Sequence, residues 1–152
     1  MFYKVFCLSC LLVICCICSA NAEELCVEEK FCYNVSLMQT PKEQAKGLMF
    51  VKSMPENEGM LFDFRKYDSK KIVMWMKNTY ISLDMVFIGC DGIIKDIYKE
   101  AKPLSLEHIK SDTDYCYVLE INGGEFDKRE MNIGDKIKYN MPLLGKLKAW
   151  LL

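Results

Sequence analysis

The 152-residue sequence predicts a β-rich α+β domain, a compact antiparallel barrel-like sheet with two short helices. Short apolar runs bounded by turn residues recur along the chain, and this is the pattern expected of strands. Between two such runs stands Gly89-Cys90-Asp91-Gly92, and an Asp-Gly pair in that position is a strong hairpin signal. Few segments have helical periodicity. Because a closed or half-closed barrel leaves few exposed strand edges, we expect the sheet to curl.

The predicted strands follow from alternating patterns and from apolar runs. The run from Ile72 to Met76 is almost continuously apolar, so we predict a strand that is covered on both faces. Residues 23–30 are expected to form an acidic lead-in, and a helical turn is expected within 104–110. The full set of predicted strands is 31–38, 60–64, 72–76, 83–88, 93–98, 115–121 and 136–139.

Two short helices are predicted from the residues at their ends. A threonine cap, a proline in the first helical position, a glutamate three residues after the cap and a terminating glycine mark the first helix. These residues are Thr40, Pro41, Glu43 and Gly47. The first helix is therefore expected over 41–46. The second follows Gly123-Gly124 and is expected over 125–130.

The N-terminus has the pattern of a secretory signal peptide. Lys4 precedes an apolar run from Val5 to Cys18, and Ala20-Asn21-Ala22 forms a small-x-small cleavage site. The run is shorter than the roughly 20 residues of a spanning helix, which favours cleavage after Ala22 over a retained anchor. The expected divisions are a signal peptide over 1–22, a lead-in over 23–34, a β-rich domain over 35–140 and a tail over 141–152.

Cleavage would leave four of the nine cysteines, which are Cys26, Cys32, Cys90 and Cys116. An even number of cysteines in an exported protein suggests disulfides. Three pairings are possible, of which we prefer Cys26–Cys32 with Cys90–Cys116. The alternative is that Cys90 and Cys116 are small buried residues on strands. The expected location is the periplasm or cell envelope of a bacterium.

The C-terminal tail, residues 141–152, has apolar residues at helical spacing with lysines opposite them. This pattern predicts a short amphipathic helix. Two roles remain open for it. The helix could pack back onto the barrel, or it could contact a membrane surface or a partner.

The charge balance and the motif content exclude several classes of function. The chain has 20 Lys and Arg against 21 Asp and Glu, so it lacks the basic excess of a nucleic-acid-binding protein. Its single histidine, His108, rules out a multi-histidine zinc site and is expected to be exposed. No nucleophile elbow or phosphate-binding loop is present. We therefore assign no catalytic residue, metal ligand or cofactor.

Polar residues cluster near the ends of two predicted strands and suggest a ligand-binding cleft at the barrel mouth. The candidate ligand-binding residues are Trp75, Lys77, Asn78, Thr79, Asp84 and Glu120. An anionic or polyhydroxy small ligand, or an envelope protein, would meet Lys77 and Asn78. The alternative is that these polar groups only lock the structure. Trp75 is either a core residue or a stacking platform.

Two other functions remain as alternatives. Met74 and Met76 carry thioethers, which suit Cu(I), although core packing is the favoured explanation for them. Asp84 and Glu120 could act as the carboxylate pair of a hydrolase if they shared one cleft.

Four sequence segments resemble the domain-of-unknown-function 192 (DUF192) family. They are Gly47-Leu48-Met49, Glu58 to Phe62, Trp75 to Asp84, and Tyr117 to Glu120 with Gly124 and Gly134-Asp135 beyond. The resemblance spans residues 35–139. It implies a small exported or envelope-associated β-rich domain. It implies no reaction and no catalytic residues, because the family has no established biochemical activity.

Overall fold

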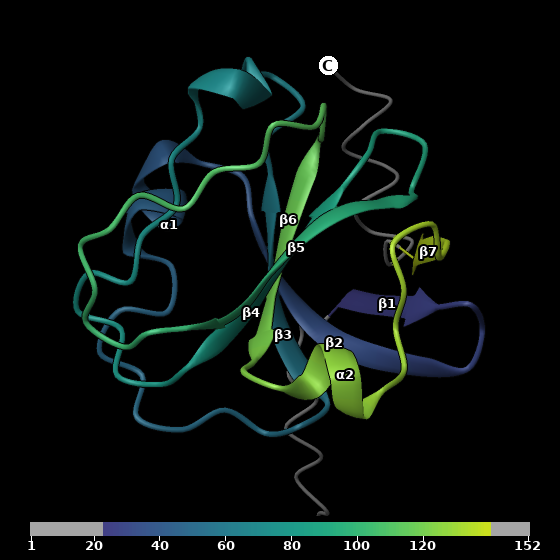
Figure 1. The fold of residues 1–152 in the computed structure, drawn as a ribbon, viewed down its shortest axis with the longest axis horizontal. Coiled ribbons are helices and arrows are strands. Elements are labelled where there is room, and N and C mark those ends of the chain that lie inside the picture. Colours follow the sequence, from purple (N-terminus) through teal and green to yellow (C-terminus); the bar gives the residue numbers. More distant parts are fainter. Residues whose placement is uncertain (1–22, 141–152) are drawn as a thin grey trace, which may run out of the picture.

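The computed structural model describes residues 23–140, which fold into one seven-stranded mixed sheet that curls into a half-barrel (Figure 1). The strands pair in the order β5-β4-β6-β3-β2-β1-β7. Their bounds are β1 Glu23–Val27, β2 Phe31–Met38, β3 Glu58–Asp63, β4 Leu83–Ile88, β5 Ile94–Ala101, β6 Tyr117–Asn122 and β7 Ile137–Asn140. The helices are α1 Pro41–Lys46, α2 Glu125–Lys128 and a 3-10 turn, Ser69–Lys71. The expected β-rich α+β fold is confirmed.

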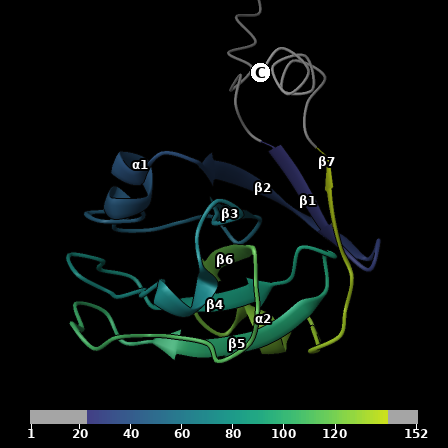
Figure 2. The same ribbon diagram turned by 90° about the horizontal axis from the view of Figure 1, so that it is seen from above.

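The sheet curls, and its two edge regions therefore approach each other. In Figure 2, β1 and β2 lie on one side of the molecule, β4 and β5 on the other, and β3 and β6 between them. The N–H of Ile94 donates to the Asp135 carbonyl at 3.0 Å, and the N–H of Ile137 donates to the Gly92 carbonyl at 2.7 Å. Backbone groups near β5 and β7 are thereby paired, as a partly closed barrel requires.

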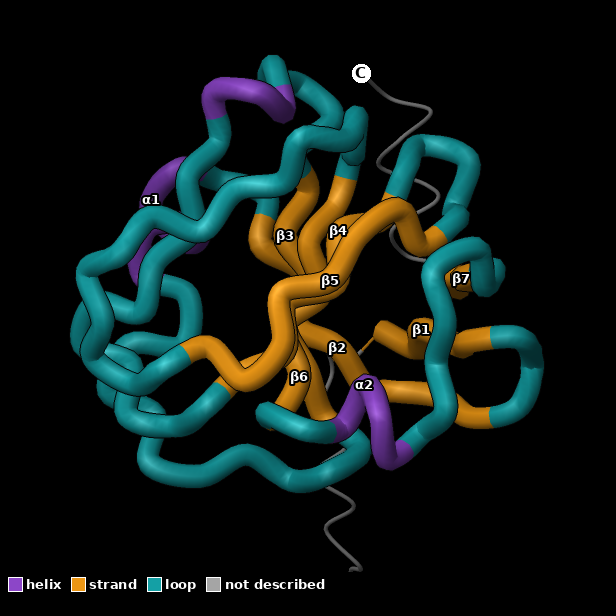
Figure 3. Tube along the Cα trace, in the orientation of Figure 1, coloured by secondary structure: helices purple, strands orange, loops and turns teal. Residues whose placement is uncertain are grey.

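The sheet was expected to be antiparallel, but it is mixed, because β2 and β3 run parallel. The other paired strands are antiparallel. A parallel pair needs a crossover, and here α1 and the loop after it provide one. Figure 3 shows the long loops gathered with α1 on one side of the sheet, while α2 lies on the other side.

Two apolar clusters cover the two faces of the sheet. The first, which we call the barrel core, fills the inside of the curl and includes Val86, Ile88, Leu119 and Ile121. The second, which we call the loop-side core, lies beneath α1 and the long loops and includes Phe62, Met85, Phe87 and Val118. Because successive strand residues point to opposite faces, β4 and β6 contribute to both clusters.

The predicted strand over 72–76 is wrong. Met74 and Met76 are buried, but Val73 and Trp75 are exposed. Only Met74 forms a bridge, to Ile109, so this segment lies against a loop instead of joining the sheet. An apolar run predicts burial on both faces only when the chain also enters a sheet.

Two further expectations are corrected. Residues 23–27, expected in an acidic lead-in, form β1, because Leu25 and Val27 are fully buried in the barrel core. The expected helical turn within 104–110 is absent from this described segment.

The end signals of α1 are confirmed. Glu43 N–H donates to the Thr40 hydroxyl at 3.3 Å, and Thr40 N–H donates to the Glu43 carboxylate at 2.9 Å. Gly47 ends the helix with a φ of +44°. The second helix is confirmed but is shorter than expected, spanning Glu125–Lys128.

No helix among residues 23–140 is long and apolar enough to span a membrane. The signal peptide over 1–22 and the tail over 141–152 lie outside the described residues.

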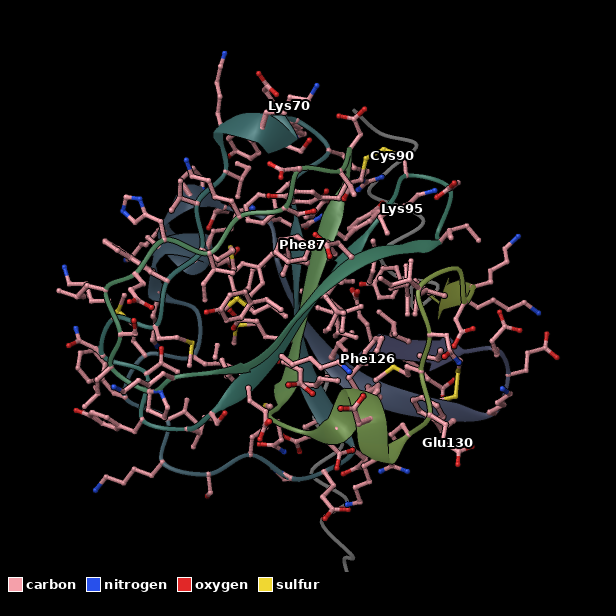
Figure 4. All side chains as sticks on the ribbon, in the orientation of Figure 1. Lys70, Phe87, Cys90, Lys95, Phe126 and Glu130 are labelled. Carbon is pink, nitrogen blue, oxygen red and sulfur yellow. A yellow bond between two sulfur atoms is a disulfide. The ribbon has the colours of Figure 1, made fainter. Side chains whose placement is uncertain are left out.

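The structure contains the preferred disulfide pairs. Cys26 lies directly opposite Cys32 in the β1–β2 ladder, with 4.0 Å between the Cα atoms. Cys90, in the hairpin after β4, is linked to Cys116, which directly precedes β6, with 5.0 Å between the Cα atoms (Figure 4). The first bond closes a short hairpin, and the second ties together segments 26 residues apart in the sequence.

Removing the Cys90–Cys116 bond should destabilise the protein more than removing Cys26–Cys32. Loop-closure entropy predicts a loss of about 3.5 kcal/mol for the longer loop and about 2.3 kcal/mol for the shorter one. The two paired Cys→Ala variants can be compared by urea denaturation of the oxidised proteins. Equal losses would contradict the loop-length explanation.

Candidate functional site

A cleft opens on the loop-side face of the sheet, above β3 and β6. It has a volume of about 50 Å³. Its lining comes from the end of α1 and the residues after it (44–49), from Phe62, from 73–75, and from Lys77, Thr79 and Glu120. Four segments far apart in the sequence therefore meet at this cleft.

Glu120 is in the cleft because of the register of β6. It pairs with Met60 of β3 and Met85 of β4. Its neighbours Leu119 and Ile121 belong to the barrel core, so strand alternation turns Glu120 to the loop side. A carboxylic acid thereby stands on a face that is otherwise covered by apolar side chains.

Glu120 is only 4% exposed. Its side chain has no hydrogen-bond or ion-pair partner within residues 23–140, and burial raises its pKa to about 8. Desolvation disfavours the charged form, so the carboxyl group is mostly neutral at pH 7. Within the described residues, this carboxyl group of the cleft has neither a hydrogen-bond partner nor an ion-pair partner.

Gly59 allows β3 to lie close beside β6. A Cβ atom at this position would lie 2.9 Å from the carbonyl oxygen of Glu120. Gly59 lies within β3. Its lack of a side chain permits the close approach that holds Glu120 in place.

Trp75 and Lys77 stand at the mouth of the cleft. Trp75 is 42% exposed, so the interpretation of Trp75 as a core residue is wrong. The ammonium nitrogen of Lys77 lies 5.1 Å from the centre of the Trp75 ring, within range of a cation–π interaction. Lys46 is also exposed and lines the cleft. Thr79 is buried, and its hydroxyl lies 3.4 Å from the Lys77 carbonyl.

The structure thus brings together four of the six candidate residues, which are Trp75, Lys77, Thr79 and Glu120. Asn78 adopts a positive φ of +56°, and its side-chain nitrogen lies 4.0 Å from the sulfur of Met49. Its carbonyl accepts a hydrogen bond from the N–H of Phe50 at 2.8 Å. Asn78 is therefore a turn residue that borders the cleft and does not line it.

Asp84 is not part of the cleft. It is fully buried, and its register partner is Ile121 of the barrel core, so it lies on the opposite face of the sheet from Glu120. Its two carboxylate oxygens accept hydrogen bonds from the N–H groups of Glu100 at 2.7 Å and Phe126 at 2.9 Å. These contacts favour the alternative explanation, in which Asp84 stabilises the structure and does not bind a ligand.

The hydrolase hypothesis required Asp84 and Glu120 to share a cleft, and the structure does not meet this requirement. The two thioethers of the soft-metal hypothesis, Met74 and Met76, both belong to the loop-side core. Met76 is fully buried, so a cation would have to enter packed apolar side chains to reach it. His108 is exposed, as expected.

Sequence reasoning missed the contribution of α1. Lys46 and the Gly47-Leu48-Met49 segment line the cleft, and a Cβ atom at Gly47 would lie 3.3 Å from the ring of Phe62. The only signal was that Gly47-Leu48-Met49 belonged to the segments that carry the family resemblance. Phe50, 59% exposed, follows directly and packs edge-on against Tyr80, with 6.3 Å between ring centres.

A second cavity, of about 270 Å³, lies at the end of the barrel core. Its lining combines apolar residues such as Leu25 and Leu61 with polar ones such as Tyr117 and Tyr139. The charged residue in its lining, Asp91, is already paired with Lys95 at 2.7 Å. Tyr139 also has a buried hydroxyl group with no hydrogen-bond partner among the described residues. The Glu120 cleft is smaller, but its group without a partner is a carboxyl group with a raised pKa.

Comparisons with known proteins support the family resemblance. The DUF192 family model, described as Uncharacterized ACR, matches residues 25–139. A candidate transcription regulator from Sinorhizobium meliloti 1021 is 34% identical and has a similar structure, with a TM-score of 0.72 over 78% of this chain and 95% of that one. A protein of unknown function from Novosphingobium aromaticivorans DSM 12444 is 33% identical, with a TM-score of 0.71 over 76% of this chain and 83% of that one. No curated protein matches the chain.

Proposed function

Because the chain belongs to the DUF192 family, which is described only as uncharacterized, we propose its function from the cleft: it is an exported accessory domain that binds a small ligand or an envelope partner at Glu120 and Lys77. The observation that carries this proposal is a buried carboxyl group without a partner among residues 23–140, at the floor of an open cleft. The fully enclosed side-chain atoms without a partner in this part of the chain belong to other residues, so the Glu120 oxygens keep access to the cleft, where a ligand would pair with them.

The size of the cleft limits what it can hold. At about 50 Å³ it is far smaller than the several hundred Å³ of a drug-sized ligand site. One polar group would enter it, and the rest of the ligand would lie on the exposed surface outside. Phe50, Trp75 and Tyr80 supply exposed aromatic area around the same loops.

Export is supported by the sequence pattern of residues 1–22 and by the two disulfides. Disulfides persist in oxidising compartments and are rare in the bacterial cytosol. The balance of 20 basic and 21 acidic residues gives no reason to extend the regulator description of the S. meliloti protein to nucleic-acid binding here.

Thermal unfolding of the oxidised protein with a panel of sugars, carboxylates, polyanions and amines tests this proposal. A ligand at 100 times its dissociation constant should stabilise by about 2.7 kcal/mol, a shift of several degrees. Lys77→Ala should reduce the shift, and Glu120→Met, which fills the same space without a carboxyl group, should abolish it. Lys70→Ala is the matched control, because Lys70 is exposed and does not line the cleft.

No shift with any class of ligand would contradict binding of a small ligand. A shift that survives in Glu120→Met would place the site elsewhere. Because both outcomes are read against the Lys70→Ala control, a general change in stability is not mistaken for a loss of binding.

A further inference from the structure

We infer that the group held in the cleft is a carboxylate, whose oxygens accept a hydrogen bond from the side chain of Glu120 while Lys77 and Lys46 balance its charge. This inference rests on the proposed function, because it names the ligand class of the same site.

The first argument is the charge of the lining. Apart from Glu120, the charged residues that line the cleft are Lys46 and Lys77. The acids nearest in sequence are engaged elsewhere. Glu43 accepts hydrogen bonds from backbone N–H groups at the start of α1, and Asp63 binds Arg65 at 2.6 Å. An incoming cation would therefore meet two like charges and at most one carboxylate, whereas an anion would meet two opposite charges.

The second argument is the protonation state of Glu120. The group is buried beneath apolar side chains, with its register neighbours Met60 and Met85 on either side. Its pKa of about 8 keeps it in the acid form at neutral pH, so it can donate a hydrogen bond. A hydrogen bond from an O–H group to a carboxylate is charge-assisted and about twice as strong as a neutral one.

The third argument is the supply of free donors. The side-chain nitrogen of Gln44 is already used, because it donates to the carbonyls of Met38 and Asp63. The hydroxyl of Thr79 is also used, because it donates to the Lys77 carbonyl at 3.4 Å. The remaining polar side chains of the lining are the two lysines, Trp75 and the neutral Glu120, and all of them can donate. A ligand group that only accepts hydrogen bonds fits this set, and a carboxylate also fits the volume of about 50 Å³.

Matched three-carbon probes test the ligand class. In a Trp150→Phe background, Trp75 is the only tryptophan, so its fluorescence reports on the cleft mouth. Propionate, propylammonium and 1-propanol would be titrated at pH 6.5 and constant ionic strength. We expect a saturable signal with propionate alone, and we expect Lys77→Ala to weaken it.

The pH dependence separates the role of Glu120 from general anion attraction. Affinity for propionate should be constant from about pH 6 to 7 and should fall about tenfold by pH 9, because the proton donor is lost as Glu120 ionises near pH 8. Glu120→Gln keeps an N–H donor that does not titrate, so it should bind propionate without this fall. Unchanged wild-type affinity at pH 9 would overturn the assigned role of Glu120.

The carboxylate could belong to a free acid or to the C-terminus of a polypeptide. An acetylated tripeptide acid that binds more tightly than propionate would assign it to a chain end, and equal affinity would assign it to a free acid. Equal binding of the amidated tripeptide would overturn the carboxylate assignment. Binding of propylammonium or propanol instead of propionate would overturn the ligand class but keep the cleft as a site. Failure of all three probes and of the ligand panel would overturn the proposed function as well.

Discussion

Replacing Glu120 with glutamine should remove a loss of stability of about 4 kcal/mol that the wild-type protein undergoes as the pH rises from 4.5 to about 8. In the unfolded chain this carboxyl group ionises near its ordinary pKa of 4.5. In the folded protein it keeps its proton until about pH 8, because ionisation would bury a charge. Between these values the native state binds more protons than the unfolded state, so stability falls with rising pH.

The penalty is absent below pH 4.5 and constant above about pH 8. Urea unfolding of wild type and Glu120→Gln at pH 4.5, 6 and 8 would measure it, in buffers that contain no carboxylate. The difference in unfolding free energy should shift by about 4 kcal/mol in favour of the variant between pH 4.5 and 8. Glu107→Gln, at an exposed position, is the control and should show no such shift. A Glu120→Gln difference that stays constant across the range would mean that Glu120 is ionised in the folded protein at neutral pH.

Features with local causes could be predicted from the sequence. The strand over 31–38 and the helix over 41–46 have the predicted bounds. The hairpin around Asp91-Gly92 also forms. Each depends on residues within a few positions of one another, such as the reciprocal hydrogen bonds of Thr40 and Glu43. Local chemistry of this kind is visible in a single sequence.

Features that depend on distant partners could not be predicted. β1 contains only two fully buried apolar residues, Leu25 and Val27, and it is stabilised by pairing with β2 and β7. The apolar run over 72–76 shows the opposite case. Its pattern predicts a strand, but the segment lies against the loop around Ile109. In both cases tertiary pairing outweighs the pattern of the segment itself.

The candidate site could be predicted in part for a related reason. Proximity in sequence correctly grouped Trp75, Lys77 and Thr79, and Glu120 was added from another strand. The same reasoning included Asp84, because it lies near the end of the same polar segment. The pairing of Met85 with Glu120 turns Asp84 to the other face, and a register cannot be inferred from one sequence. The contribution of Lys46 depends on how α1 folds over the sheet, which has no local signal.

Replacing Asp84 with alanine should reduce the free energy of unfolding by about 4 kcal/mol. Two residues of β5, Lys99 and Glu100, lie between the register pairs on either side of Asp84, so the ladder is interrupted there. The N–H of Glu100 is paired with the Asp84 carboxylate instead. The other oxygen accepts from Phe126 in the first turn of α2, whose N-cap residue, Gly124, has no side chain to do so. Alanine would leave both N–H groups unpaired.

Urea denaturation would measure this loss, with Asp112→Ala as the matched control, because Asp112 is exposed and its change should stay within about 0.5 kcal/mol. Asp84→Asn keeps one acceptor oxygen and should lose about half as much as Asp84→Ala. Because Asp84 lies on the opposite face from Glu120, the folded Asp84→Asn protein should bind propionate with wild-type affinity. A stable Asp84→Asn protein with lost propionate binding would show that Asp84 acts on the cleft. The barrel core and the cleft would then be coupled, and the structural explanation of Asp84 would be wrong.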